Sequence, residues 1–171
     1  MTEQNSGFSA YSCLRAARSL SAPSGVTFVP VRSALDMHAA IVQRKDEVDA
    51  IVMTAAVADY RPKATEPHKM KKTDTLTLEL VKNPDILAEM GSKKGRRVLI
   101  GFALEVQNAR ASAVAKYRAK NLDAIVLNRP ATFGSETIRA EIVTEDGVVK
   151  LAASKRALAD HLVALAVQLH G

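Results

Sequence analysis

Small side chains followed by a carboxylate end one apolar run of the sequence, a pattern that suits ligand binding. Residues 55–59 read Ala-Ala-Val-Ala-Asp, and side chains this small would let a ligand approach the backbone closely. The carboxylate of Asp59 could hold a metal ion or accept hydrogen bonds from a base or a sugar. Asp59 could equally cap a turn ahead of Pro62, and on chemistry alone both interpretations stay open.

A basic segment follows directly. Residues 61–72 hold five Lys or Arg side chains and one Glu, a local charge of +4, and Pro62 and Pro67 argue against a continuous helix. A cationic loop suits phosphates, and a lysine in it can neutralise the charge that develops on phosphorus during nucleotidyl transfer. Charge alone favours the simpler alternative, a solvated surface loop.

Two further positions could bind an anion. Asn83 resembles a helix N-cap with Pro84 at the first helical position, and free backbone N–H groups at a helix start can bind an anion, although an ordinary capped helix explains the same residues. Lys116 and Lys120 are four residues apart and share a helix face, so they could clamp a triphosphate. A solvated basic face is the commoner explanation of such a pair. Phe102 could stack on a base, although core packing is its more usual role.

The elements that would position these residues alternate along the chain. Continuous apolar runs are typical of parallel strands buried on both faces, and such alternation favours a parallel α/β sheet. This sheet binds ligands at the carboxyl ends of its strands, where the loops described above begin. The predicted order is strand 26–31, helix 33–42 with Ser33 as N-cap, strand 50–57, strand 98–103, helix 109–121 and strand 124–127.

The two ends of the chain differ in pattern. Asp146-Gly147 between β-prone runs at 138–143 and 148–151 predicts a hairpin. The leucines at 158, 162, 165 and 169 lie on one face of a predicted helix over 155–170. Residues 1–25 are weakly patterned, with a short helix expected over 11–20. We therefore expect residues 26–171 to form a single domain.

Composition narrows the function classes. The 24 basic and 18 acidic residues give a net charge of +6, which suits an anionic ligand or a nucleic acid. Seven aromatic residues, none of them Trp, weigh against a base-stacking surface, and we expect no nucleic-acid partner. A lone cysteine, Cys13, excludes an internal disulfide and fits a reducing compartment. We expect no membrane span, no secretory signal and a cytoplasmic location.

Familiar catalytic patterns are missing from the sequence. The four histidines do not pair at metal-ligand spacing, so we assign no zinc site. There is no Gly-x-Gly-x-x-Gly after a predicted strand, which counts against a dinucleotide enzyme, and no Walker loop.

Taken together, several motifs resemble the phosphopantothenate–cysteine ligase family, also called phosphopantothenoylcysteine synthetase. In bacteria this domain is usually the C-terminal half of a bifunctional coenzyme A biosynthesis flavoprotein. The likeness runs from about residue 26 to the end of the chain. It rests on Ala-Ala-Val-Ala-Asp-Tyr at 55–60, Lys-Met-Lys-Lys at 69–72, Val-Lys-Asn-Pro-Asp-Ile at 81–86, Gly-Phe-Ala at 101–103 with Glu105, and Lys-Asn-Leu-Asp at 120–123.

The resemblance implies a Rossmann-like three-layer α/β domain with a mainly parallel sheet and a C-terminal β-hairpin plus helix. It also implies a reaction in two steps. CTP activates the carboxylate of 4′-phosphopantothenate as an acyl-cytidylate, releasing pyrophosphate, and the amine of cysteine then displaces CMP. Magnesium assists, the family is typically a homodimer, and no flavin is expected in this chain.

By motif position, the resemblance also implies roles for individual residues. Lys69 would contact the phosphates and support activation, as the catalytic residue. Lys116 and Lys120 would bind the triphosphate, and Phe102 would help to form the nucleotide pocket. The nucleotide site would comprise Ala55, Asp59, Lys69, Pro84, Asp85, Ile86, Leu87, Phe102, Lys116 and Lys120.

The sequence also departs from the family. The family opens with a strand and a loop whose asparagine holds the acyl-cytidylate, and no counterpart is found here. Leu104 stands where the family usually has alanine. The resemblance thus implies an intact nucleotide side and a shortened acyl-substrate side. The alternatives are a non-catalytic CTP-binding module, a fragment that needs a partner chain, and an unrelated Rossmann-like domain that binds another nucleotide.

Overall fold

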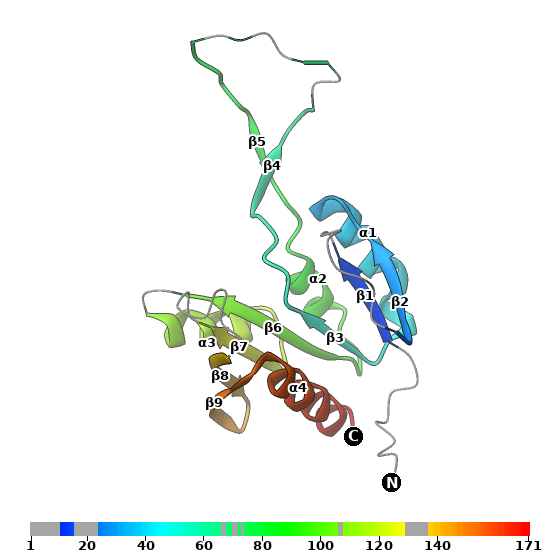
Figure 1. Cartoon of the computed structure of the whole chain (residues 1–171), viewed down its shortest axis with the longest axis vertical. Coiled ribbons are helices and arrows are strands. Elements are labelled where there is room, and N and C mark those ends of the chain that lie inside the picture. The colour runs from blue at the N-terminus through cyan, green and yellow to red at the C-terminus, as the bar shows by residue number, and fades with distance from the viewer. Residues whose placement is uncertain are drawn as a thin grey trace.

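A five-stranded mixed sheet forms the centre of the molecule in this computed structural model (Figure 1). The structure describes residues 11–15, 24–65, 68–69, 72, 74–105, 108–128 and 137–171. The strand order is β3-β6-β7-β8-β9, parallel from β3 to β7 and antiparallel from β7 to β9. The five strands are β3 (Ala50–Met53), β6 (Val98–Leu104), β7 (Ala124–Asn128), β8 (Thr137–Thr144) and β9 (Gly147–Ser154).

The central strands separate two hydrophobic cores. Leu99 and Ile125 belong to the core under α1 (Ala34–Arg44), α2 (Ile86–Ser92) and α3 (Ala109–Ala119). Ile100 and Val126, one residue further along each strand, belong to the core under α4 (Lys155–His170). Successive side chains of a strand point to opposite faces. The sheet is therefore covered on both sides, and the predicted three-layer α/β architecture is confirmed.

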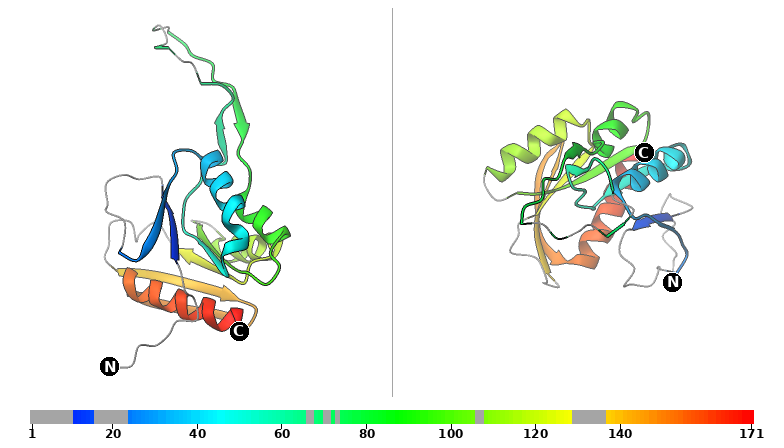
Figure 2. Two further views of the ribbon diagram at one scale, coloured as in Figure 1. Left: turned by 90° about the vertical axis from the view of Figure 1, so that its right-hand side faces the viewer. Right: turned by 90° about the horizontal axis from the view of Figure 1, so that it is seen from above.

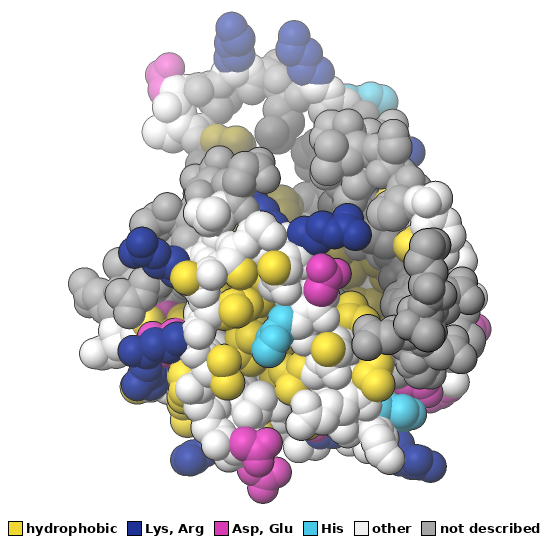
Figure 3. Space-filling view, turned by 60° about the horizontal axis from the view of Figure 1, so that its bottom comes forward, with side chains coloured by type: hydrophobic (Ala, Val, Ile, Leu, Met, Phe, Trp, Pro, Cys, Tyr) yellow, Lys and Arg dark blue, Asp and Glu magenta, His cyan; other side chains and the backbone are white. Residues whose placement is uncertain are grey.

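Local signals account for several elements. Ser33 caps α1 in a capping box with Asp36, as predicted, which satisfies backbone N–H groups of the first turn. The turn after Asp146 places Gly147 at φ 134°, a conformation that favours glycine, so the predicted β8–β9 hairpin is confirmed. Helix α4 begins after the N-cap Ser154. Figure 3, viewed toward the side that carries α4, shows hydrophobic side chains gathered on this face.

A second, two-stranded sheet lies beside α1 (Figure 2). Strands β1 (Tyr11–Arg15) and β2 (Val26–Pro30) pair in parallel. The predicted strand over 26–31 is confirmed. The helix predicted over 11–20 is wrong for residues 11–15, because pairing with β2 overrides the weak local preference of this segment. Residues 16–20 lie outside the described part of the chain.

The third sheet is an arm that projects from the body (Figure 1). Strands β4 (Tyr60–Pro62) and β5 (Leu80–Lys82) pair in antiparallel fashion. The strand predicted over 50–57 ends at Met53 instead. It is not buried on both faces either, since Val52 is 42% exposed.

Candidate functional site

Asn83 joins the loop after β3 to the start of α2. Its backbone N–H donates to the carbonyl of Asp59 at 2.7 Å, and its side-chain Nδ2 donates to the carbonyl of Ala58 at 2.8 Å. Its Oδ1 accepts from Arg61 at 3.2 Å. Only 8% of Asn83 is exposed. A buried amide with three such contacts fixes the two segments against each other.

The two residues expected to bind a ligand from the loop are exposed. Ala55 follows β3 and Asp59 precedes β4, and both side chains face solvent. The Asp59 main chain is held through Asn83, and its side chain is exposed. This arrangement agrees with either interpretation of Asp59, ligand contact or turn.

Helix α2 begins two residues later than predicted. Asp85, not Asn83, is the N-cap, and its carboxylate accepts from the N–H of Ala88 at 3.0 Å. The first helical residue is Ile86 rather than Pro84. The side chains of Ile86 and Leu87 are 2% and 8% exposed and belong to the hydrophobic core. A ligand at this helix start would therefore meet their main chain, not their side chains.

Lys120 comes from the end of α3 to the cap of α2. Its Nζ donates to the Asp85 carboxylate at 2.9 Å. Partial burial acts to raise the pKa of Asp85, but hydrogen bonds from Lys120 and the Ala88 N–H outweigh it, so the pKa lies below its ordinary value. The Asp85 carboxylate is consequently ionised near neutral pH, and it holds the lysine ammonium beside the helix start.

Lys116, one helical turn before Lys120, also contacts a carboxylate. Its Nζ lies 2.6 Å from Oε1 of Glu105, the residue that follows β6. Ser112 donates to the same carboxylate oxygen at 3.0 Å. The hydrogen bond from Lys116 lowers the pKa of Glu105 below its ordinary value. Both ammonium groups of the predicted lysine pair therefore contact a carboxylate, Lys116 directly after β6 and Lys120 at the start of α2.

Phe102 lies on the other side of the sheet. It is half-buried and packs against the core under α4, whereas Asp85 and Lys120 belong to helices on the opposite face. In the structure as it stands, Phe102 does not join the lysine–carboxylate group.

Lys69 is also apart from that group. It is exposed and lies in the segment that connects β4 and β5, two strands that project away from the body (Figure 1 and Figure 2). Lys71, its neighbour in the predicted motif, lies outside the described residues. The structure therefore brings together the segments of Asp59, Asp85, Lys116 and Lys120, and leaves Lys69 and Phe102 at separate places.

The contacts made by Asn83 and Glu105 were not predicted from the sequence. Asn83 was considered only as a helix cap, and Glu105 only as part of a motif. A buried role for Asn83 is hard to read from sequence, because its partners Ala58 and Asp59 are more than twenty residues away. Glu105 gave a usable signal, since an acidic residue directly after a buried strand lies at the ligand-binding edge of the sheet.

The described residues contain neither a cluster of metal-ligating side chains nor a membrane-spanning helix. These residues contain no group of three or more His, Cys, Asp or Glu side chains that could hold a metal ion. Magnesium does not need such a group, because it is often bound by one or two carboxylates together with substrate phosphates. No helix in the described ranges is long and apolar enough to cross a bilayer.

The chain is thus a three-layer α/β domain with one lysine–carboxylate pair after β6 and another at the start of α2. Residues 10–169 match the family described as DNA/pantothenate metabolism flavoprotein C-terminal domain. The chain belongs to this family.

Curated relatives carry one recurring name. The chain is 46% identical over 135 residues to the coenzyme A biosynthesis bifunctional protein CoaBC of Bacillus subtilis, which covers 75% of this chain and 33% of the relative. It is 36% identical over 154 residues to the Escherichia coli K12 protein of the same name, covering 85% and 38%. The chain thus spans about a third of the length of these relatives.

Solved structures agree on the fold. The chain resembles the C-terminal domain of CoaBC with a TM-score of 0.77 and 32% identity, covering 92% of this chain and 73% of that one. It also resembles the DNA/pantothenate metabolism flavoprotein from Streptococcus pneumoniae, with a TM-score of 0.75 and 18% identity over 94% and 80% of the two chains. A Cab2 mutant in complex with phosphopantothenate-cysteine has a TM-score of 0.65 and 13% identity, over 85% and 54%. The last two likenesses concern the fold alone.

Proposed function

We propose that this chain is a phosphopantothenate–cysteine ligase domain, which ligates cysteine to 4′-phosphopantothenate at the expense of CTP in coenzyme A biosynthesis. Family membership and the names of the relatives support the role in coenzyme A biosynthesis. CTP, the acyl-cytidylate, magnesium and the homodimer are our own proposals.

The proposal rests on two lysine–carboxylate contacts made by side chains of the α3 segment, one at the start of α2 and one directly after β6. Lys120 and Lys116 each hold a carboxylate at 2.9 and 2.6 Å. Both lysines are partly exposed, at 26% and 47% of their side chains. We infer that Asp85 and Glu105 act as internal anions that a triphosphate replaces, because phosphate oxygens offer the same charge to the same ammonium groups.

The ligation would proceed in two steps. A carboxylate oxygen of 4′-phosphopantothenate would attack the α-phosphorus of CTP, and pyrophosphate would leave. The amine nitrogen of cysteine would then attack the acyl carbon, CMP would leave, and the amine would lose a proton. Lys116 and Lys120 would neutralise the phosphates, and Lys69 would approach the reacting phosphate from the arm.

A second copy of the chain would account for the arm. Three leucines of the arm are exposed by 51 to 66%, and Tyr60 by 59%. Exposed apolar patches of this kind often mark protein–protein contacts. In a homodimer the arm would be covered, and its Lys69 would reach the lysine–carboxylate group of the other copy. The leucines are Leu76, Leu78 and Leu80.

Magnesium would enter with the triphosphate. The described side chains provide no three-carboxylate site, so we assign the ion no residue and route no step through it. No flavin is proposed for this chain.

Calorimetry with CTP in the presence of magnesium tests the nucleotide site, with ATP and NAD as controls. Selective CTP binding is expected, and Lys116→Ala with Lys120→Ala should weaken it by about tenfold or more, the loss of two charge-assisted contacts. Lys155→Ala, at the start of α4 on the other face, serves as the matched control. NAD binding in place of CTP would favour the unrelated-domain alternative and overturn the proposal.

The second candidate is a CTP-binding module without catalysis. The position of Lys69 between β4 and β5, on the arm that carries none of the other site lysines, favours it. Release of pyrophosphate that requires both CTP and 4′-phosphopantothenate separates the two candidates. CTP binding without such release would support the module.

A further inference from the structure

The arm has very little packing of its own. Its strands β4 and β5 pair over three residues each. Of the described residues from Tyr60 to Lys82, only Arg61 and Val81 are not exposed, and these two lie opposite each other in the strand register. A two-stranded ribbon of this kind is marginally stable by itself. The direction of the arm must therefore be set at its base, where β4 and β5 leave the body (Figure 1).

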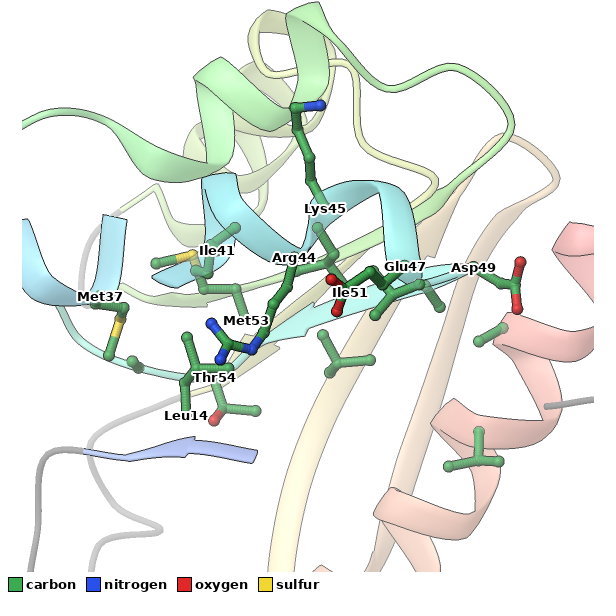
Figure 4. A pocket seen from close by; sticks show the side chains of 16 residues that line it. Leu14, Met37, Ile41, Arg44, Lys45, Glu47, Asp49, Ile51, Met53 and Thr54 are labelled. Atoms are coloured by element: carbon green, nitrogen blue, oxygen red, sulfur yellow. The ribbon is translucent and has the colours of Figure 1, made fainter. Parts of the chain in front are cut away.

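The segment that leads from β3 into the arm is also weakly packed. Of residues 54–59, only Val57 is not exposed, and it packs beside the core under α1, α2 and α3. Thr54 and Ala55 border a groove of about 370 Å³ beside β3 (Figure 4). Side-chain packing therefore gives this segment little support, and hydrogen bonds must supply more of it.

Arg61 forms the hydrogen bonds that close the base of the arm. From β4, its Nη1 donates to the carbonyl of Lys82 at 2.7 Å and to Oδ1 of Asn83 at 3.2 Å. Lys82 is the last residue of β5. Asn83 is the buried residue that is bonded to the carbonyls of Ala58 and Asp59. The Arg61 guanidinium thus joins β4 to the end of β5 and to the segment before α2.

The chemistry of these two bonds suits a firm joint. A hydrogen bond from a charged donor is roughly twice as strong as one between neutral groups. Both bonds come from one nitrogen of Arg61, so a lysine ammonium in the same place could form them too, whereas an apolar side chain could form neither. Asn83 keeps its bonds to Ala58 and Asp59 in either case. The loop after β3 therefore stays tied even when the arm is released.

We propose that Arg61 is a positioning residue for the ligation, because it fixes the direction of the arm that carries Lys69. This inference rests on the proposed function. Lys69 lies in the segment that connects β4 and β5, so a small rotation at the base of the arm displaces it. A displacement of about 1 Å at a reacting group can cost about a hundredfold in rate. Lys116 and Lys120, which belong to the α3 segment, would still hold the triphosphate.

Spin labels can measure the direction of the arm without any substrate. One label is attached at Thr77→Cys in the arm and one at Ser92→Cys in α2, both exposed positions, in a chain that also carries Cys13→Ala. Double electron–electron resonance then gives the distance between the labels, with unlabelled chain in excess so that only distances within one chain contribute. We expect a narrow distance distribution with Arg61 in place, and one about twice as wide in Arg61→Met.

Pyrophosphate release measures the effect on the reaction, with rates expressed per CTP site as counted by calorimetry. Arg61→Met should lower kcat by about tenfold or more and change KM for CTP by less than about twofold. Arg61→Lys should restore most of the lost kcat, because its ammonium can serve both acceptors. Lys63→Met is the matched control and should change neither quantity, since Lys63 is a cation of the arm that pairs only with the exposed Glu79 among the described side chains.

Three results would overturn the proposal. The first is the same distance distribution in Arg61→Met as in the chain that keeps Arg61. The second is an equal effect of Arg61→Met and Lys63→Met on kcat. The third is a raised KM for CTP with kcat unaltered in Arg61→Met, which would place Arg61 in nucleotide binding instead. A wild type that releases no pyrophosphate would contradict the proposed function itself, and the distance measurement then decides alone whether Arg61 fixes the arm.

Discussion

Asn83 shows how one buried side chain can position a ligand loop. Its amide ties the carbonyl of Ala58 and the backbone of Asp59 to the residues before α2. Asn83→Asp replaces the donor Nδ2 by an oxygen facing a carbonyl oxygen. We expect the free energy of unfolding to fall by about 1–3 kcal/mol, the cost of a buried group without its partner.

Urea denaturation measures this loss, and calorimetry then tells whether CTP affinity falls with it. Gln168→Ala, on the exposed side of α4, is the control and should leave both unchanged. A variant Asn83→Asp of unaltered stability would contradict the role assigned to Asn83.

Glu89 should make the stability of the fold depend on pH, and a single substitution can test this. Hydrogen bonds from Lys93 and then from His38 lower its pKa from 4.5 to about 2, and the His38 Nε2–Glu89 Oε2 distance is 2.6 Å. Because the folded pKa is depressed, the stabilising contribution is complete above pH 4.5 and is lost as the pH falls toward 2. The stability difference between the wild type and Glu89→Gln should shrink across this window.

Thermal unfolding at several pH values between 6 and 2 measures that difference. Glu79→Gln is the control, because Glu79 lies in the exposed arm with Lys63. A wild-type advantage that stays constant down to pH 2 would show that Glu89 is not the group responsible.

At the scale of elements, a glycine sets how closely α2 approaches the end of α3. A Cβ added at Gly91 would lie 1.9 Å from the carbonyl oxygen of Lys120, far inside a normal contact. Gly91→Ala must therefore move the two helix ends apart, and we expect a loss of about 1–3 kcal/mol in stability. The same movement shifts Lys120 away from the proposed triphosphate site, so CTP binding should weaken.

Ser92→Ala, at the exposed neighbouring position, provides the comparison and should change stability by less than about 0.5 kcal/mol. Chemical denaturation followed by CTP calorimetry gives both quantities. Equal behaviour of the two variants would contradict tight packing at Gly91.

Elements with a local signal could be predicted from sequence. Ser33 supplied a cap for α1, and the Asp146-Gly147 pair supplied a turn for the hairpin, because both act on neighbouring backbone groups. The end of β3 at Met53 could not be predicted from an apolar run that continues to Val57. Strand ends depend on the partner strand, and β6 pairs only as far as Met53.

The candidate site was likewise predictable only where its signals are local in sequence. The loops could be located from the ends of the apolar runs, and the spacing of Lys116 and Lys120 placed them on one helix face. Their carboxylate partners lie 11 and 35 residues away, and such pairs arise only when the sheet brings distant segments together. Phe102 lies on one face of the sheet or the other according to a shift of a single residue along β6. An unbroken apolar run does not reveal which face that is.

The arm should decide the oligomeric state. Leu76→Asp with Leu78→Asp places charges on side chains that are 66% and 56% exposed, so the fold should survive and a homodimer should separate into monomers. Light scattering coupled to size-exclusion chromatography measures the mass.

Val149→Asp on β9, at 50% exposure, is the matched control and should leave the mass unchanged. A wild type that is monomeric at every concentration would contradict the proposed dimer. A dimer that persists in the double variant would show that another surface forms the contact.

The separation of the β1–β2 sheet has a consequence for how the molecule unfolds. This sheet shares no strand pairing with the central sheet in the described residues, and it is attached through side chains packed around α1, with Leu14 and Val29 beside the core. Contacts of this kind allow a part of a protein to detach while the rest remains folded. The β1–β2 sheet is therefore expected to behave as a separate cooperative unit, one that opens well below the global unfolding free energy.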